Sequence, residues 1–276
     1  SSDGYILTND HVAGNAKKVI VTMTNGEKYD AKIIGSDRVT DVALLKIEGK
    51  NFPYIKLGNS SEVIVGEWTI AFGNPFGLFD KNAKPTVTVG VVSNQGVSFT
   101  QEDRVYRDMI QTDAAISSGN SGGPLLNALG EVIGMNTVIF STAQSMNGAG
   151  SIGIGFSIPV NRVKKTVDLL KAGKELDRNF TTGMSVRGID DQLARALALD
   201  RSDGVIITDV YRNSPASNAG LEAGDIILEV DGQRIVSEDD VLVTVNDGVV
   251  GQKLDLYIQR GKDKMHKILT LERRTQ

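Results

Sequence analysis

The sequence predicts a mainly β protein with two domains, and three observations support this. Between Tyr5 and Ile158, short apolar runs alternate with turn signals such as Asn25-Gly26 and Leu129-Gly130, a spacing typical of a β-barrel or sandwich. The 30 glycines suit a β protein with many turns. The 276 residues exceed the roughly 150 that one ordinary core requires.

Composition excludes several classes of function. The chain has 30 basic and 34 acidic side chains and no long basic cluster, so nucleic-acid binding is not indicated. It has no cysteine, which excludes disulfides and thiolate metal sites. Its two histidines lie far apart and no H-E-x-x-H motif is present, so we expect neither a metal nor a cofactor. No apolar run reaches the roughly 18 residues that span a bilayer, and no signal peptide is present.

The elements of the first domain follow in order along the chain. Apolar runs predict strands at residues 19–21, 43–47, 69–72, 87–92 and 132–135. Residues 152–159 (IGIGFSIP) predict a further strand, whose alternate glycines let a substrate backbone approach and pair; a plain core strand is the alternative. Valines and Leu170 at spacings of three and four predict a helix over 160–172 that Gly173 ends. We therefore expect a first domain at 1–173, a linker at 174–180 and a second domain at 181–276.

Residues 119–124 (GNSGGP) are the most informative segment. A serine between glycines on a tight turn can expose its hydroxyl while neighbouring backbone N–H groups converge on one point. This arrangement suits acyl transfer, with Ser121 as the nucleophile and the N–H groups of Gly119 and Ser121 as the oxyanion hole. A serine nucleophile needs a base, so the chain must also supply a histidine.

His11 is the better candidate for the base. It follows an apolar strand and enters a polar turn, whereas His266 lies on the wet face of a charged strand. The acid that orients the imidazole is predicted to be Asp41, at the mouth of a buried strand. Asp37 and Asp113 are the competing carboxylates.

Four ordered motifs carry a resemblance to a known family. They are residues 8–12 (TNDHV), 40–46 (TDVALLK), 73–77 (GNPFG) and 111–124 (QTDAAISSGNSGGP). Together they resemble the HtrA family of serine proteases, the DegP, DegS and DegQ types. The resemblance implies a chymotrypsin-like fold of two six-stranded β-barrels, with His11 as base, Asp41 as acid and Ser121 as nucleophile in the cleft between them.

The resemblance also implies how the protein works. It implies an ATP-independent endopeptidase of protein quality control, trimeric or larger, that cleaves unfolded or mislocalised proteins in the periplasm or cell envelope. Its specificity pocket for small to medium apolar side chains would be formed by Ile116, Ile152, Gly153, Ile154 and Gly155. Family members carry an upstream strand and an oligomerisation segment, and any signal or membrane anchor would belong to that segment, upstream of Ser1.

Asn120 precedes the nucleophile. Relatives of the digestive type place an aspartate there, which pairs with a freshly cleaved N-terminus. Asparagine cannot form that ion pair, so we expect switching by rearrangement of the 116–120 loop rather than by propeptide cleavage.

The last third resembles a PDZ domain of the HtrA type. The resemblance rests on residues 204–210 (GVIITDV), 213–221 (NSPASNAGL) and 224–227 (GDII). It implies a module that adds the C-terminus of another chain as a strand and regulates the protease through its active-site loops. The residues implied to bind the peptide are Thr181, Thr182, Gly183, Met184, Ser185 and Val186. The other wall would be a helix near 237–246, which its valines make a weak helix former.

A second hypothesis remains open at this point, namely a binding or chaperone protein whose protease fold is dormant. Three features favour it: the absence of a first strand before Ser1, the carboxylate of Asp10 beside the candidate base, and serines at 117–118 where relatives carry other residues.

Overall fold

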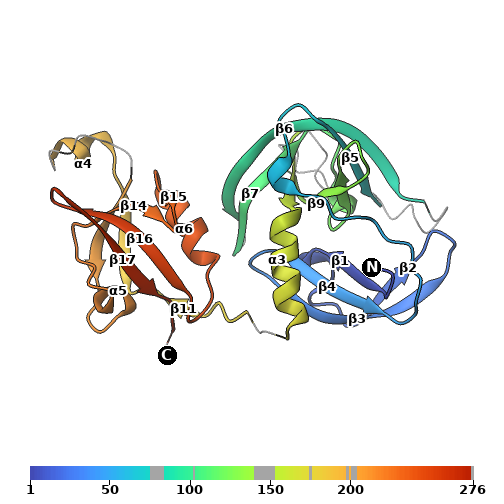
Figure 1. Cartoon of the computed structure of the whole chain (residues 1–276), viewed down its shortest axis with the longest axis horizontal. Helices are drawn as coiled ribbons and strands as arrows, with labels where there is room; N and C mark the ends of the chain where they lie inside the picture. The colour runs from blue at the N-terminus through green and yellow to red at the C-terminus, as the bar shows by residue number, and fades with distance from the viewer. Residues whose placement is uncertain are drawn as a thin grey trace, which may run out of the picture. The chain divides into compact units, whose positions relative to one another are not determined.

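The structure is a computed structural model that describes residues 1–74, 84–101, 103–139, 153–173, 176–196, 199 and 204–274. It divides into two compact units, Ser1–Glu175 and Leu176–Gln276, and each is described by itself (Figure 1). Residues 75–77 of the third motif and Ile152 lie outside the described residues, as do residues 174 and 175 of the expected linker. No helix in the described part of the chain has the length and apolar character needed to cross a membrane.

The first unit begins with an antiparallel sheet of order β1-β4-β3-β2. Its strands are β1 (Tyr5–Thr8), β2 (Val19–Thr22), β3 (Lys28–Asp37) and β4 (Val42–Ile47), and the short helix α1 (Asp10–Ala13) follows β1. The apolar run of β4 is almost fully buried, which makes this strand the centre of the sheet. The described residues of this half form four strands, fewer than the six that the resemblance implies.

The second half of the unit is a closed barrel of order β10-β7-β6-β5-β8-β9. Its strands are β5 (Trp68–Gly73), β6 (Thr86–Gln101), β7 (Arg104–Thr112), β8 (Pro124–Leu126), β9 (Val132–Ile139) and β10 (Gly155–Pro159). The 3-10 helices η1 (Ser60–Glu62) and η3 (Ser118–Asn120) lie in its connections. Strands β6 and β7 form a long hairpin, drawn in blue-green and green in Figure 1.

Helix α3 (Val160–Lys171) joins the two halves. Its buried side chains, Val160, Val163, Val167 and Leu170, recur at the predicted spacing. The helix contacts β3 and β4 of the first sheet and β9 and β10 of the barrel (Figure 1). At its far end, a Cβ on Gly35 would lie 3.0 Å from Leu170 Cδ2, so the glycine lets β3 approach the helix. The two sheets are thereby held at a fixed position, which places residues from both in one site.

The second unit is built on the strand order β12-β13-β14-β16-β17. Its strands are β11 (Phe180–Thr181), β12 (Met184–Gly188), β13 (Val205–Val210), β14 (Ile226–Val230), β15 (Gln233–Arg234), β16 (Lys253–Arg260), β17 (Asp263–Thr270) and β18 (Glu272–Arg273). The helices are α4 (Asp191–Ala196), α5 (Pro215–Asn218) and α6 (Glu238–Asn246). Because β12 stands first in this order, one of its edges has no neighbouring strand among the described residues.

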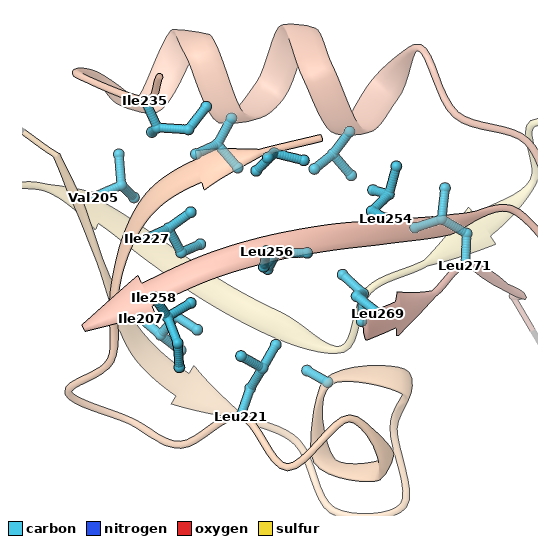
Figure 2. Close-up of a cluster of buried hydrophobic side chains, with 14 of the residues drawn as sticks. Val205, Ile207, Leu221, Ile227, Ile235, Leu254, Leu256, Ile258, Leu269 and Leu271 are labelled. Atoms are coloured by element: carbon cyan, nitrogen blue, oxygen red, sulfur yellow. The ribbon is translucent and has the colours of Figure 1, made fainter. Parts of the chain in front are cut away.

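The core of this unit is aliphatic. Leu254, Leu256 and Ile258 alternate along β16 and meet Ile207 and Ile227 of neighbouring strands (Figure 2). Val241 and Val245 of α6 pack on the same cluster, and this burial outweighs their weak helix propensity. The helix also begins with a capping box, in which the Ser237 and Asp240 side chains accept each other's backbone N–H groups.

Candidate active site

Asp41 lies in the turn between β3 and β4, and its side chain is fully buried. Its φ of +57° is a left-handed conformation, which aspartate tolerates better than most residues. Two neighbours hold this backbone. The Asn9 side chain donates to the Asp41 carbonyl at 2.9 Å, and Asp37 accepts hydrogen bonds from the backbone and hydroxyl of Thr40. The turn therefore fixes the direction in which the Asp41 carboxylate points.

His11 lies on α1, directly after β1, with its side chain one-third exposed. Its Nδ1 is 2.9 Å from both carboxylate oxygens of Asp41, and its backbone N–H donates to Asp41 Oδ1 at 3.1 Å. The carboxylate thus fixes both the ring and the main chain of the histidine. Because Nδ1 faces the carboxylate, the opposite nitrogen, Nε2, is directed away from it and is the one that can take a proton from a nucleophile.

Ser121 follows η3 and precedes β8, in a turn that lies against the segment carrying His11. Gly122 has a φ of +80°, and a Cβ there would collide with Thr8 Oγ1 and lie 3.2 Å from the backbone nitrogen of Asn9. Asn136 holds the other side of the turn, because its carbonyl accepts from Gly122 N–H and its N–H donates to Gly123. These contacts place the turn that carries Ser121 beside the end of β1, the strand that precedes His11.

Thr137 and Tyr106 also contact Asp41, and neither was predicted from the sequence. The Thr137 hydroxyl donates to Asp41 Oδ2 at 2.6 Å, and its carbonyl accepts from the Ser121 hydroxyl at 3.1 Å. The Tyr106 hydroxyl donates to the same carboxylate oxygen at 3.3 Å. The polar pair at 136–137, which follows an apolar run, was the only sequence feature that could have suggested a role for Thr137. No local sequence feature suggested a role for Tyr106.

The hydrogen bonds determine the ionisation of Asp41. Burial alone raises the pKa of this carboxyl, but the hydrogen bonds from His11 and Thr137 and the charge of His11 outweigh burial and lower the pKa below its ordinary value. Burial, together with the charge of Asp41, raises the pKa of the Tyr106 hydroxyl. The site therefore holds an ionised carboxylate with a neutral tyrosine as donor.

The turn before Ser121 has a defined backbone pattern. Asn120 N–H donates to the Ser117 carbonyl at 2.8 Å, and the Gly119 carbonyl accepts from Asn74 N–H at 2.8 Å. The Asn120 side chain is buried and accepts from the Ser117 hydroxyl. A cavity of about 430 Å³ opens beside this turn, lined by Gly119, Ser121 and apolar side chains of Ile55, Phe72, Pro85 and Leu126.

The residues expected to form a specificity pocket are partly brought together. A Cβ on Gly155 would lie 2.5 Å from Ile116 Cγ1, so the buried Ile116 packs directly over this glycine. Gly155 pairs with Thr112 on β7 and with Ile139 on β9, which occupies both of its edges. Gly153 has open space beside it and Ile154 is half-buried. Of this segment, Gly153 and Ile154 precede β10.

The remaining ionisable candidates lie elsewhere. Asp113 accepts from Val91 N–H at 2.7 Å and braces β6 rather than His11. Asp10 is buried, and its carboxylate lies where a Cβ on Gly14 would be. His266 belongs to the second unit, where it contacts Asp255 at 3.0 Å on an exposed surface. Among the described residues, no group of three or more His, Asp or Glu side chains is placed to hold a metal.

The residues expected to bind a C-terminal peptide form one loop and one strand of the second unit. Gly183 has a φ of +69°, and its carbonyl accepts from Tyr211 N–H and from the Ser214 hydroxyl. The Thr182 carbonyl accepts from Ala216 N–H, which ties the 181–183 loop to α5. The following residues belong to β12, and α6 lies beside that strand, with Glu238 accepting from Gly188 N–H.

Gly122→Ala is expected to lower the free energy of unfolding of the first unit by about 3 kcal/mol, because the added Cβ combines left-handed strain with a collision against Thr8. Gly130→Ala is the matched control. Its φ of +77° is similar, but a Cβ meets nothing within 4 Å, so a loss of about 1 kcal/mol is expected. Urea unfolding followed by the fluorescence of Trp68, the single tryptophan, measures both. Equal losses would show that the contact with Thr8 is unimportant.

Three comparisons with known proteins show what the chain is similar to. A family model described as "Trypsin-like peptidase domain" matches residues 1–135, and one described as "PDZ domain" matches residues 181–270. The chain is 47% identical over 238 residues to a "Probable periplasmic serine endoprotease DegP-like" of Chlamydia muridarum, covering 86% of this chain and 45% of the relative. It is 41% identical over 260 residues to the protein of the same name from Pseudomonas putida, covering 94% and 52%.

Solved structures are similar as well. The structure described as "HtrA-type protease AlgW with decapeptide" is 36% identical, with a TM-score of 0.79, and the match covers 100% of this chain and 81% of that one. A serine endoprotease from Yersinia pestis is 32% identical, with a TM-score of 0.67, covering 99% and 86%. The chain spans about half the length of the curated relatives it matches.

Proposed function

The chain belongs to the HtrA/DegP-like family of serine proteases, with a trypsin-like domain followed by one PDZ domain, and from this premise we propose that it is itself a serine endopeptidase. One observation carries the proposal. The buried Asp41 carboxylate is bonded to His11 Nδ1, and Thr137 links the same carboxylate to the Ser121 hydroxyl. A base, its orienting acid and a nucleophile thus meet around one buried charge.

In the proposed mechanism, the Ser121 side chain rotates from the Thr137 carbonyl to His11 Nε2. Its oxygen attacks the scissile carbonyl while His11 takes the hydroxyl proton, and the imidazolium formed is stabilised by Asp41. The N–H groups of Gly119 and Ser121 donate to the oxyanion of the tetrahedral intermediate. His11 then passes the proton to the leaving amine, and water hydrolyses the acyl-enzyme by the same route. Small to medium apolar side chains would lie against Ile116, with Gly153, Ile154 and Gly155 nearby.

We further propose that the enzyme acts in protein quality control, on unfolded or mislocalised chains. The curated relatives are named periplasmic, and this supports the periplasm or cell envelope as its location. The PDZ unit would bind C-terminal peptides at β12, the edge strand beside α6. Peptide binding would then act on residues 116–120, where Asn120 is already engaged by the Ser117 carbonyl and hydroxyl.

A dormant protease that only binds its partners is the second candidate. It is favoured by one contact, the hydrogen bond from the Ser121 hydroxyl to the Thr137 carbonyl, which engages the nucleophile's proton away from His11. Both candidates retain peptide binding by the second unit. They differ only in whether Ser121 reacts.

Labelling with a fluorophosphonate distinguishes the two candidates. Under the endopeptidase proposal, the parent protein is labelled and Ser121→Ala is not, and a peptide that ends in a free carboxylate increases the labelling rate. An unlabelled parent, with and without peptide, would support the dormant protein. A labelling rate that no peptide changes would contradict the proposed regulation but not the proposed activity.

We propose that the protein assembles with copies of itself through the outer face of β5 and β6. Trp68 and Ile70 alternate on β5 and pair with Val91 and Val89 of β6, so these four side chains point to one face. Trp68 is 62% exposed and Val89 58% exposed, which is unusual for neighbouring apolar side chains. An exposed apolar face with an aromatic residue is typical of a protein interface.

Trp68→Glu is therefore expected to reduce the oligomer to a monomer, because a charge would be buried in the interface. Sedimentation velocity measures the mass. Leu129→Glu is the matched control, since Leu129 is 83% exposed and lies at an isolated turn, away from this face. A monomeric parent, or a Trp68→Glu variant that sediments like the parent, would contradict the proposed interface.

A further inference from the structure

The tip of the β6–β7 hairpin reaches the turn between β3 and β4, which holds Asp41. At the beginning of β7, Val105 N–H donates to the Val39 carbonyl at 2.8 Å. Arg38 and Asp103 form an exposed ion pair at 3.4 Å across the same junction. Residues of β7 are thereby placed directly over the candidate catalytic acid.

Arg104, the first residue of β7, forms an ion pair with that acid. Its Nε lies 3.4 Å from Asp41 Oδ1, and its side chain is 13% exposed. The two neutral donors, Thr137 and Tyr106, contact the other oxygen, Oδ2. The carboxylate is therefore contacted on one oxygen by a permanent cation and on the other by hydroxyl groups. A permanently charged neighbour that is largely shielded from solvent acts on a fully buried carboxylate with little screening by salt.

The charge balance around Asp41 follows from the groups that face it. Helix α1 supplies His11, β7 supplies Arg104 and Tyr106, and β9 supplies the uncharged Thr137. In the turn itself, Asp37 is occupied by Thr40. Tyr106 is neutral, so among the described contacts the Asp41 carboxylate faces one permanent positive charge, that of Arg104. A proton taken up by His11 would add a second positive charge beside this one carboxylate.

We propose that Arg104 is a positioning residue of the catalytic acid, which fixes the Asp41 carboxylate and offsets its charge, and so limits how strongly His11 holds a proton. The proposal rests on the proposed function, because it concerns the same site. Its physical basis is that a carboxylate raises, and a nearby guanidinium lowers, the proton affinity of an imidazole.

Arg104→Gln tests this proposal. Removing the cation leaves the charge of Asp41 unopposed, so the pKa of His11 is expected to rise by about 0.5 to 1 unit. The acid limb of the pH profile of kcat/KM is expected to move by the same amount. Below that limb, kcat/KM for casein falls about 3- to 10-fold, since activity follows the neutral fraction of His11. Above the limb, the loss is smaller.

The proton NMR titration of the histidines is a readout that needs no activity. The chain has two histidines, so the signal of His266 in the second unit serves as an internal reference for that of His11. If none of the proteins cleaves casein, the proposed function fails, but this titration still decides the role of Arg104. Conversely, if the protein cleaves casein but the His11 titration is the same in the parent and in Arg104→Gln, only the proposal about Arg104 is contradicted.

Two control variants separate charge from structure. Arg104→Lys keeps the charge and is expected to titrate like the parent. Arg38→Gln loosens the same junction without a contact to Asp41 and is expected to leave the His11 titration unchanged. An unchanged titration in Arg104→Gln would overturn the proposal, as would an equal shift in Arg104→Lys or in Arg38→Gln.

Arg104→Gln leaves Asp41 buried without its cation, which can prevent folding. The double variant Asp41→Asn/Arg104→Gln removes both charges and decides in that case. Recovery of a folded first unit, seen as a cooperative thermal transition in Trp68 fluorescence, would support the pairing of Arg104 with Asp41. A double variant that is still unfolded would overturn it.

Discussion

Ser121→Ala is expected to reduce kcat for casein by roughly a millionfold, the loss typical when a serine protease loses its nucleophile. The loss is so large because no other group in the site can form the acyl-enzyme, and His11 and Asp41 then have no proton to move. The change removes one hydrogen bond, from Ser121 Oγ to the Thr137 carbonyl, so the thermal transition of the first unit should move little. Fluorescein-labelled casein measures the rate.

The control is Ser93→Ala, because Ser93 is an exposed serine on β6. It should keep the rate of the parent. Turnover that survives in Ser121→Ala at more than a trace would show that another residue, or a contaminating protease, carries the activity. If another residue of this protein carries the activity, the assignment of Ser121 as the nucleophile is wrong.

Asp41→Asn is expected to reduce kcat about 10⁴-fold while the backbone stays in place. An asparagine in this position offers its amide to His11 Nδ1, which favours the tautomer with its proton on Nε2, the nitrogen that must accept the serine proton. Asparagine tolerates the φ of +57° as well as aspartate does, so little backbone strain is added. Steady-state kinetics at pH 8 measure the loss.

Asp113→Asn is the matched control, since that carboxylate braces Val91 and has no contact with His11 among those described. It should change kcat only a few-fold. A large loss in Asp113→Asn together with a small one in Asp41→Asn would exchange the roles of the two carboxylates.

The same variant reports the stability that Asp41 contributes. Because its folded pKa lies below the ordinary value, the ionised carboxylate stabilises the first unit above the unfolded pKa of about 4, and this contribution is lost as pH falls through the lower folded pKa. The Tm of the parent should therefore exceed that of Asp41→Asn at pH 7 and approach it in acid. A difference that is constant down to acid pH would mean that the stabilisation does not depend on ionisation.

Sequence patterns were sufficient to predict the candidate site residues that lie in local motifs. The strand before His11, the buried strand after Asp41 and the glycine turn around Ser121 each show a signal within about ten residues, and the helix that ends the first domain follows the predicted spacing. Helix α6 forms although its valines disfavour it, because the capping box and the core outweigh propensity.

The partners of the acid could not be predicted in this way. Tyr106 is 65 residues from Asp41 in sequence and Thr137 is 96 residues away, and both come from the barrel rather than from the sheet that carries Asp41. Arg104 reaches the carboxylate only because the β6–β7 hairpin crosses to the neighbouring sheet. Contacts of this kind depend on how two sheets dock, which no single segment encodes. The direction of the Ser121 hydroxyl is likewise set by Thr137.

The link through Thr137 also bears on the order in which the chain is synthesised. Of these residues a ribosome releases His11 and Asp41 first, Ser121 much later and Thr137 last, so a growing chain has no assembled active site until the strands of the closed barrel have left the exit tunnel. Up to that stage the nascent protease cannot attack its own unfolded segments or those of neighbouring nascent chains.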